Sequence, residues 1–257
     1  MPAQMKSELD HLPPRKQREL ARIQEILLRE FDRAREGGTA AWRTKGGITG
    51  IILFGSYARG TWVDEPYTKK GYKSDYDLLI IVSHEKLTDF ATFWFEAWEA
   101  VFRETYIRTP VSFIIHTLDE VNTALKQGRY FFVDICREGI VLHDTPKLRL
   151  ATPRALTPPV ALEMAQEHFE FWMDNAKKSA GMAEFAISKG WLNNAAFEFH
   201  QATEHAYAAL LLTLTNYKPS THNIRNLRSM AEDLTQEIAP AWPRTTPKAR
   251  ARYNKLR

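Results

Sequence analysis

The stretch from Leu53 to Val82, LFGSYARGTWVDEPYTKKGYKSDYDLLIIV, contains residue types that suit the binding of phosphate and metal ions. Gly55 and Ser56 follow an apolar run, and a turn of this kind at a helix start offers backbone N–H groups and a hydroxyl to an anion. On a strand, Asp75 and Asp77 place both carboxylates on one face and Tyr76 on the other. Two carboxylates on one face repel each other unless a cation lies between them. Mg²⁺ or Mn²⁺ is the expected cation, because it binds one or two carboxylates together with phosphate oxygens. The pattern predicts metal-assisted nucleotidyl transfer.

The elements around these residues alternate between helix and strand. Apolar residues at helical spacing after two prolines predict a first helix, and continuous apolar, β-branched runs predict buried strands. The alternation indicates an α/β (α+β) domain with a short mixed sheet. We expect helices over 14–31 and 89–104, shorter helical pieces over 118–125 and 128–139, and strands over 47–56, 74–83, 109–117 and 140–144.

A proline-rich segment divides the chain. Residues 145–159 contain four prolines and little periodicity, which is typical of a linker. After it the pattern is helical only, over 160–190, 191–216 and 221–238, with Thr221 as the expected N-cap of the last helix. We therefore predict two domains, 1–150 and 151–257.

The composition fits a protein of the reducing cytoplasm. The chain has 257 residues, a single cysteine, Cys136, and no apolar run of the length that a membrane span needs. Its N-terminus lacks the apolar core of a signal peptide. The net charge of +4 is compatible with a polyanionic partner but does not identify one.

The segments LFGSYARG and SDYDLLI resemble the signature of the DNA polymerase beta-like nucleotidyltransferase superfamily, in its minimal branch. The resemblance implies that Gly55 and Ser56 bind a nucleotide such as ATP. Arg59, in the same segment, is expected either to join this nucleotide site by balancing phosphate charge or to pair with a nearby acid. The resemblance also implies that Asp75 and Asp77 are the catalytic metal ligands in the transfer of a nucleoside monophosphate from a triphosphate to a hydroxyl. The hydroxyl would belong to a small molecule, an RNA or other nucleic acid end, or a protein tyrosine.

Two features depart from the superfamily pattern. Eighteen residues separate Ser56 from Asp75, so 63–73, with Lys69, Lys70 and Lys73, is an expected inserted loop. The superfamily normally supplies a third carboxylate from a later strand, but the matching strand here offers Ser112. The nearest acids, Glu104, Asp119 and Glu120, lie outside that strand.

The segments EHFEFWMDNAKKSA and AFEFHQATEHAYAALLLTLTNYKPSTHNIRNL resemble the HEPN domain of the sacsin branch, so the chain resembles a nucleotidyltransferase–HEPN fusion. The resemblance implies an all-α bundle, a homodimer formed through it, and a polar cleft that binds nucleotide or RNA. Such fusions continue with further helical sequence, so the bundle is expected to be short of a closing helix. The expected cleft residues are His200, Glu204 and Tyr207, which share one helix face with Asn193, and His222; His205 lies on another face and is expected to be structural.

The nuclease motif of HEPN proteins is an arginine followed after four to six residues by a histidine. His222 takes the histidine position, but Asn216 and Lys218 precede it where the arginine is expected. Lysine lacks the guanidinium fork, so RNA cleavage is not expected. Two alternatives to the transferase remain. One is a regulatory protein whose weakened transferase domain only senses nucleotide, and the other is a fused toxin–antitoxin-like ribonuclease.

Overall fold

The computed structural model describes residues 5–63, 74–219, 221–243 and 246–253. They form two compact units. The first contains the described residues up to Gly128 and Phe132–Arg154, and the second contains Arg129–Phe131 and the described residues from Ala155 onward. The lysines of the inserted loop, Lys69, Lys70 and Lys73, lie outside the described residues. Val63 and Ser74, on either side of that loop, bond to each other: the Ser74 N–H donates to the Val63 carbonyl at 2.8 Å, and the Val63 N–H donates to Ser74 Oγ at 3.0 Å.

The first unit is built on a four-stranded sheet with the order β3-β2-β1-β4. Strand β1 runs antiparallel to both β2 and β4, whereas β2 and β3 are parallel. The expected short mixed sheet is therefore confirmed. Its strands are β1 (Ile48–Phe54), β2 (Tyr76–Val82), β3 (Val111–Thr117) and β4 (Ile140–Asp144).

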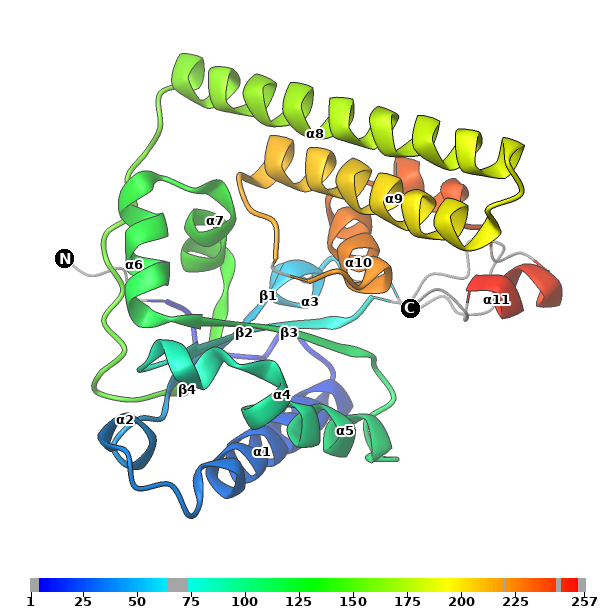
Figure 1. Ribbon diagram of the computed structural model, residues 1–257. Helices are drawn as coiled ribbons and strands as arrows, with labels where there is room; N and C mark the ends of the chain where they lie inside the picture. The colour runs from blue at the N-terminus through cyan, green and yellow to red at the C-terminus, as the bar shows by residue number, and fades with distance from the viewer. Residues whose placement is uncertain (1–4, 64–73, 220, 244–245, 254–257) are drawn as a thin grey trace. The chain divides into compact units, whose positions relative to one another are not determined.

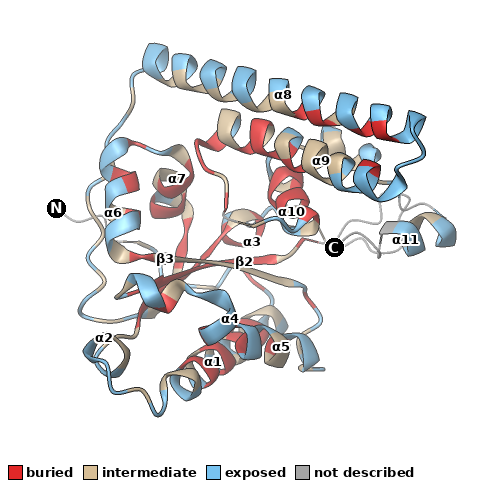
Figure 2. Cartoon of the chain, in the orientation of Figure 1, coloured by how far each residue is buried: buried red, intermediate tan, exposed pale blue. Residues whose placement is uncertain are grey.

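Helices cover both faces of the sheet (Figure 1). One face carries α1 (Pro14–Arg35), α4 (Phe90–Phe93) and α5 (Phe95–Arg103), and the other carries α6 (Leu118–Gln127) and α7 (Tyr130–Glu138). Both faces of β1 and β2 are buried, as the continuous apolar runs indicate (Figure 2). The shorter pieces α2 (Ala41–Thr44), α3 (Gly55–Arg59) and the 3₁₀ turn η1 (Glu85–Thr88) connect these elements.

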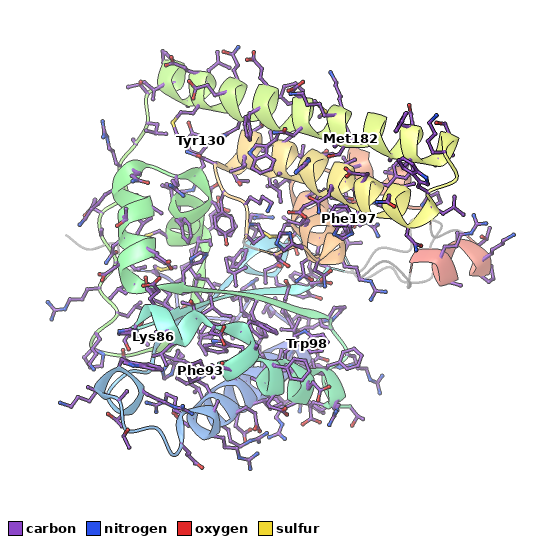
Figure 3. All side chains as sticks on the ribbon, in the orientation of Figure 1. Lys86, Phe93, Trp98, Tyr130, Met182 and Phe197 are labelled. Carbon is purple, nitrogen blue, oxygen red and sulfur yellow. The ribbon has the colours of Figure 1, made fainter. Side chains whose placement is uncertain are left out.

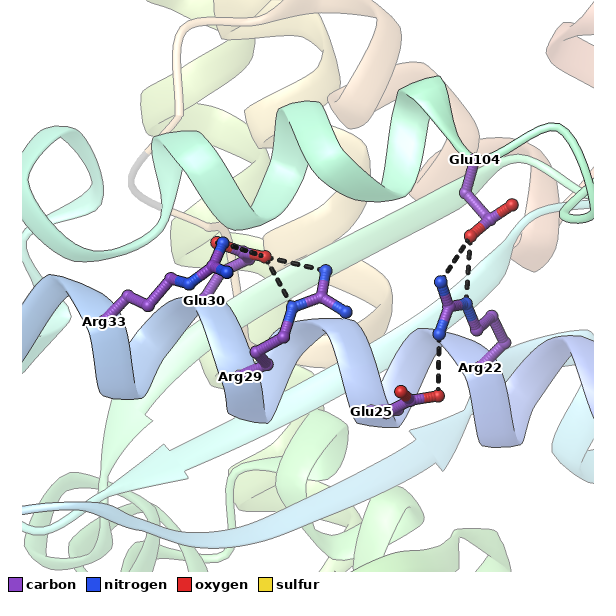
Figure 4. A network of polar contacts seen from close by, with 6 residues as sticks. All are labelled: Arg22, Glu25, Arg29, Glu30, Arg33 and Glu104. Carbon is purple, nitrogen blue, oxygen red and sulfur yellow. Dashed lines mark hydrogen bonds and ion pairs between the residues drawn. The ribbon is translucent and has the colours of Figure 1, made fainter.

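Helix α1 forms because Pro14 fixes its first turn and its apolar stripe faces the sheet. Leu20, Ile23 and Leu27 lie in the core. On its polar side, Arg22 Nε donates to the Glu104 carboxylate at the end of α5 at 2.9 Å (Figure 4). This ion pair links α1 to α5 on the same face of the sheet.

The single helix expected over 89–104 is interrupted at Trp94. Its indole is fully buried, stacks on Phe31 at 4.8 Å between ring centroids, and donates to the Leu87 carbonyl at 2.8 Å. Those tertiary contacts override the local helix pattern, so the segment forms α4 and α5.

The second unit is helical, as predicted. Helices α8 (Pro158–Ser188) and α9 (Leu192–Thr215) form a long hairpin, followed by α10 (Ile224–Leu234), the 3₁₀ turn η2 (Gln236–Ala241) and α11 (Pro247–Tyr253). The expected N-cap at Thr221 is wrong, because Asn223 caps α10 by accepting from the N–H groups of Arg225 and Asn226. In the described part of the chain, no helix is long and apolar enough to cross a membrane.

Candidate functional site

Three strands bring the candidate residues to one edge of the sheet. β1 ends at Phe54, while β2 and β3 begin at Tyr76 and Val111. In the strand register Phe54 lies opposite Asp77, and Asp77 lies beside Ser112. Paired residues on neighbouring strands point to the same face, so the turn after β1 and the carboxylate of Asp77 are close neighbours.

The turn after β1 has a backbone that requires glycine. Gly55 has φ of 73°, in the left-handed region, and opens the five-residue helix α3. Ser56 follows with only 5% of its surface exposed, and its Oγ has no hydrogen-bond partner among the described residues. Because α3 is so short, its dipole is small, and a phosphate bound at this turn would depend on the Gly55 backbone and the Ser56 hydroxyl.

The aspartates lie at the start of β2. Asp75 directly precedes the strand and is half-buried, and Asp77 is 2% exposed. Tyr76 points to the α1 face, so alternation places both carboxylates on the opposite face. The donors fit Mg²⁺, which prefers one or two carboxylates together with phosphate oxygens. Among residues 5–63, 74–219, 221–243 and 246–253, no group of three or more His, Cys, Asp or Glu side chains is arranged to hold a metal.

The position of the third carboxylate is occupied by Ser112, beside Asp77. Glu120 closes a capping box with Thr117 at the far end of β3. At about 3.3 Å per residue, Thr117 lies about 16 Å along the strand from Ser112. Asp119 lies in the same first turn of α6, and Glu104 is bound to Arg22. None of these three acids lies at the start of β3.

Arg59, at the end of α3, faces two acids of α7 that the sequence reasoning missed. Its Nη1 lies 3.9 Å from Glu138 Oε2, a loose ion pair with both side chains about one-third exposed. Asp134 lies one turn before Glu138, and burial raises the pKa of its carboxyl despite the nearby Arg137 and Arg59. Their spacing of four residues places both acids on one face of α7.

In the helical unit, Glu204 is the centre of a buried polar cluster. It is 4% exposed, and its carboxylate contacts Lys218 Nζ at 3.2 Å and His222 Nδ1 at 2.9 Å. Burial alone would raise the pKa of Glu204, but hydrogen bonds from His222 and Lys218 outweigh it and leave that pKa below its ordinary value. The His222 side chain is 81% exposed, so the cluster joins a buried carboxylate to an accessible imidazole.

The other expected cleft residues differ in burial. Tyr207 is 8% exposed, and its hydroxyl accepts a 2.8 Å hydrogen bond from the Trp242 indole. His200 is half-buried and Asn193 exposed. His205 packs its ring against Trp172 at 5.5 Å. The face is therefore solvated at its N-terminal end and buried at Glu204 and Tyr207, and its role as a cleft stays a prediction.

Comparisons with known families agree with the two-part architecture. Residues 39–130 match the family described as a nucleotidyltransferase domain, and residues 169–257 match the HEPN domain. The chain therefore carries a nucleotidyltransferase domain followed by a HEPN domain. No curated protein shows significant similarity to the chain.

Proposed function

We propose that the chain is a Mg²⁺-dependent nucleotidyltransferase that moves a nucleoside monophosphate from a nucleoside triphosphate to a hydroxyl acceptor. The observation that carries this proposal is the strand register, which sets the Gly55–Ser56 turn directly beside Asp77. The match of 39–130 to the nucleotidyltransferase domain supports it. The HEPN domain supplies a nucleotide- or RNA-binding module.

In this proposal each residue has a separate role. Asp75 and Asp77 hold the metal ion, which when bound polarises the triphosphate and neutralises charge on the pyrophosphate that leaves. The Gly55 backbone approaches the phosphates closely, and Ser56 Oγ donates to one of their oxygens. Arg59 is only loosely held by Glu138, so its guanidinium is available to balance phosphate charge.

Transfer is tested by incubating the full chain with each of the four α-labelled ribonucleoside triphosphates, Mg²⁺, and either RNA or the protein itself as acceptor. We expect label to join one acceptor and pyrophosphate to be released, with both products abolished by a chelator. Triphosphate binding without any label transfer would reject the transferase and favour the second candidate.

The second candidate is a protein that senses a nucleotide without transferring it. Ser112 favours it, because the β3 residues that share the face of Asp77 are Ser112, Ile114 and His116, and none is a carboxylate. Two carboxylates alone hold a second metal ion poorly. A Ser112→Asp variant discriminates the two candidates: a sensor with a degraded site gains label transfer, whereas a working transferase already shows it.

The chain is not expected to cleave RNA through His222. Lys218, which occupies the region of the missing arginine, is already paired with buried Glu204, so its charge is largely compensated. Cleavage of a mixed RNA pool by the natural protein and by His222→Ala measures this. Equal, background-level rates are expected, and strong cleavage that disappears in the variant would establish the ribonuclease alternative.

We also expect a homodimer formed through the helical unit. Apolar side chains stay exposed on α8 and α9, among them Phe171 at 62%. Phe197, which Figure 3 labels on α9, is 61% exposed. Exposed apolar patches of this kind commonly mark an interface, and two-fold dimers are the commonest solution. Phe169 shares this exposure, whereas Leu211 of α9 is 1% exposed and lies in the core.

Light scattering on the natural chain and on Phe171→Glu with Phe197→Glu tests the dimer. The natural chain should have twice the monomer mass. The double variant should be monomeric, with an unchanged far-ultraviolet circular dichroism spectrum. Glu184→Ala, an exposed change on α8, is the matched control and should stay dimeric. A monomeric natural chain would reject the interface.

A further inference from the structure

A buried polar network lies directly behind the candidate metal site, on the opposite face of the sheet. Glu19 of α1 is fully buried, and its Oε2 accepts from the Tyr76 hydroxyl at 3.2 Å and from Thr109 Oγ1 at 2.8 Å. Tyr76 is the residue between the two aspartates. The network therefore holds the side chain of the residue that lies between the two carboxylates.

The same network reaches the phosphate turn. Lys16 Nζ, one turn before Glu19 on α1, donates to Thr109 Oγ1 at 2.6 Å and to the Tyr57 hydroxyl at 3.0 Å. Tyr57 directly follows Ser56 and is fully buried, and its ring lies 4.4 Å from the ring of Tyr76. A continuous chain of hydrogen bonds thus runs from the residue after Ser56 to the residue between the aspartates.

The start of β3, the strand that places Ser112 beside Asp77, is held by the same network. Thr109 precedes β3, and the carbonyl of the next residue, Pro110, accepts from the Tyr76 N–H at 2.8 Å. The Thr109 hydroxyl donates to Glu19 and accepts from Lys16, so it is satisfied in both directions.

We propose that Glu19, Lys16 and Thr109 are positioning residues that set the separation between the Gly55–Ser56 turn and the Asp75–Asp77 pair. This inference rests on the proposed function. Metal-bound phosphates need both elements at a fixed spacing, and a displacement of about 1 Å costs on the order of a hundredfold in rate. The strand register places Asp77 opposite Phe54, but Ser56 and Asp75 lie outside β1 and β2, so their separation depends on further contacts.

A pair of Thr109 variants tests the role without a large change in volume. Thr109→Val keeps the shape and removes the hydroxyl, whereas Thr109→Ser keeps the hydroxyl. Tyr76→Phe removes the donor to Glu19. The control is Arg18→Ala, an exposed position on α1 between Lys16 and Glu19.

The first readout is the Mg²⁺ concentration that gives half-maximal binding of ATP, measured by calorimetry on fully folded protein. We expect an increase of about tenfold for Thr109→Val and Tyr76→Phe, with natural values in Thr109→Ser and Arg18→Ala. Equal Mg²⁺ requirements in all four variants would overturn the positioning role. A role in stability alone would lower the melting temperature and leave this requirement unchanged.

The second readout separates a failure of the inference from a failure of the proposed function. Amide hydrogen exchange in metal-free protein should be at least about tenfold faster at Ser56, Tyr57 and Asp77 in Thr109→Val, and unchanged at Ile51 in the middle of β1. This local effect is expected even if the natural chain binds no triphosphate, a result that would reject the function. Exchange that is unchanged, or equally faster throughout the unit, would overturn the inference.

Discussion

The double variant Asp75→Asn with Asp77→Asn is expected to lose metal-dependent triphosphate binding, with an affinity reduced about a thousandfold. The two substitutions keep side-chain shape but remove both negative charges from one face of β2. Metal–phosphate stabilisation amounts to several kcal/mol, and about 1.4 kcal/mol corresponds to each factor of ten in affinity. Titration calorimetry with ATP, in Mg²⁺ and in chelator, measures the change.

A matched control for that variant is Asp119→Asn. Asp119 is an exposed acid of the first unit that lies in the first turn of α6, at the far end of β3 from Ser112. The Asp119→Asn variant should bind Mg²⁺ and ATP as the natural chain does. Unchanged metal-dependent ATP binding in the Asp75 and Asp77 double variant, with a natural circular dichroism spectrum, would show that the metal and nucleotide do not bind at this edge of the sheet.

The second large effect is expected at Glu204. Replacement by alanine leaves the ammonium group of Lys218, which is only 16% exposed, without its carboxylate partner. Breaking a buried ion pair on one side typically costs 3–5 kcal/mol, and the exposure of His222 places this case near the lower end, at about 3 kcal/mol. Native-state hydrogen exchange of the α9 amides reports this loss within the helical unit.

Ionisation of Glu204 should make the stability of the helical unit depend on pH. The pKa of Glu204 is lower in the folded chain than its ordinary value near 4.5, so its contribution is complete above that value. It is lost as the pH falls through the lower, folded-state pKa. The opening free energy of α9 should therefore decrease on acidification in the natural chain, and the decrease should be smaller in Glu204→Gln.

Exposed Glu184 on α8 provides the control for the Glu204 experiments. Glu184→Ala should change the opening free energy by no more than about 0.5 kcal/mol and keep the natural pH dependence. A similar small effect for Glu204→Ala would mean that the Lys218 and His222 contacts contribute little to the helical unit.

The strands and the main helices were predictable because their apolar residues follow the period of each element. β1 and β2 are continuous apolar runs, and α1 carries its apolar stripe between a proline and a glycine. The Asp75–Tyr76–Asp77 alternation was predictable for the same reason, since a strand inverts its side chains at each residue.

The supporting residues of the site were not predictable from local pattern. Glu19 contacts Tyr76 and Thr109 across 57 and 90 residues of sequence, and no periodicity encodes such a pairing. The only signal was a glutamate adjoining the apolar stripe of α1. The burial of Glu204 was missed for a similar reason, because its partners Lys218 and His222 come from the segment after α9 rather than from its own helix.

Local rules also failed where neighbouring residues competed. Thr221 and Asn223 are both good N-caps, and the side chain of Asn223 accepts from two helix N–H groups while Thr221 Oγ1 accepts from Asn223 itself. Trp94 sits within a helical pattern, yet its buried indole fixes a break between α4 and α5. In both cases the deciding contact is a specific hydrogen bond.

Paramagnetic broadening by Mn²⁺ with ATP locates the bound metal on the chain and so decides whether the metal lies between the Gly55–Ser56 turn and the Asp75–Asp77 pair. We expect one equivalent of Mn²⁺–ATP to remove the amide signals of Gly55, Ser56 and Asp77 and to preserve that of Glu120, beyond the far end of β3. The effect should be absent in the Asp75 and Asp77 double variant. Sharp signals at Gly55, Ser56 and Asp77, with broadening elsewhere on the chain, would show that the metal and nucleotide bind at another site.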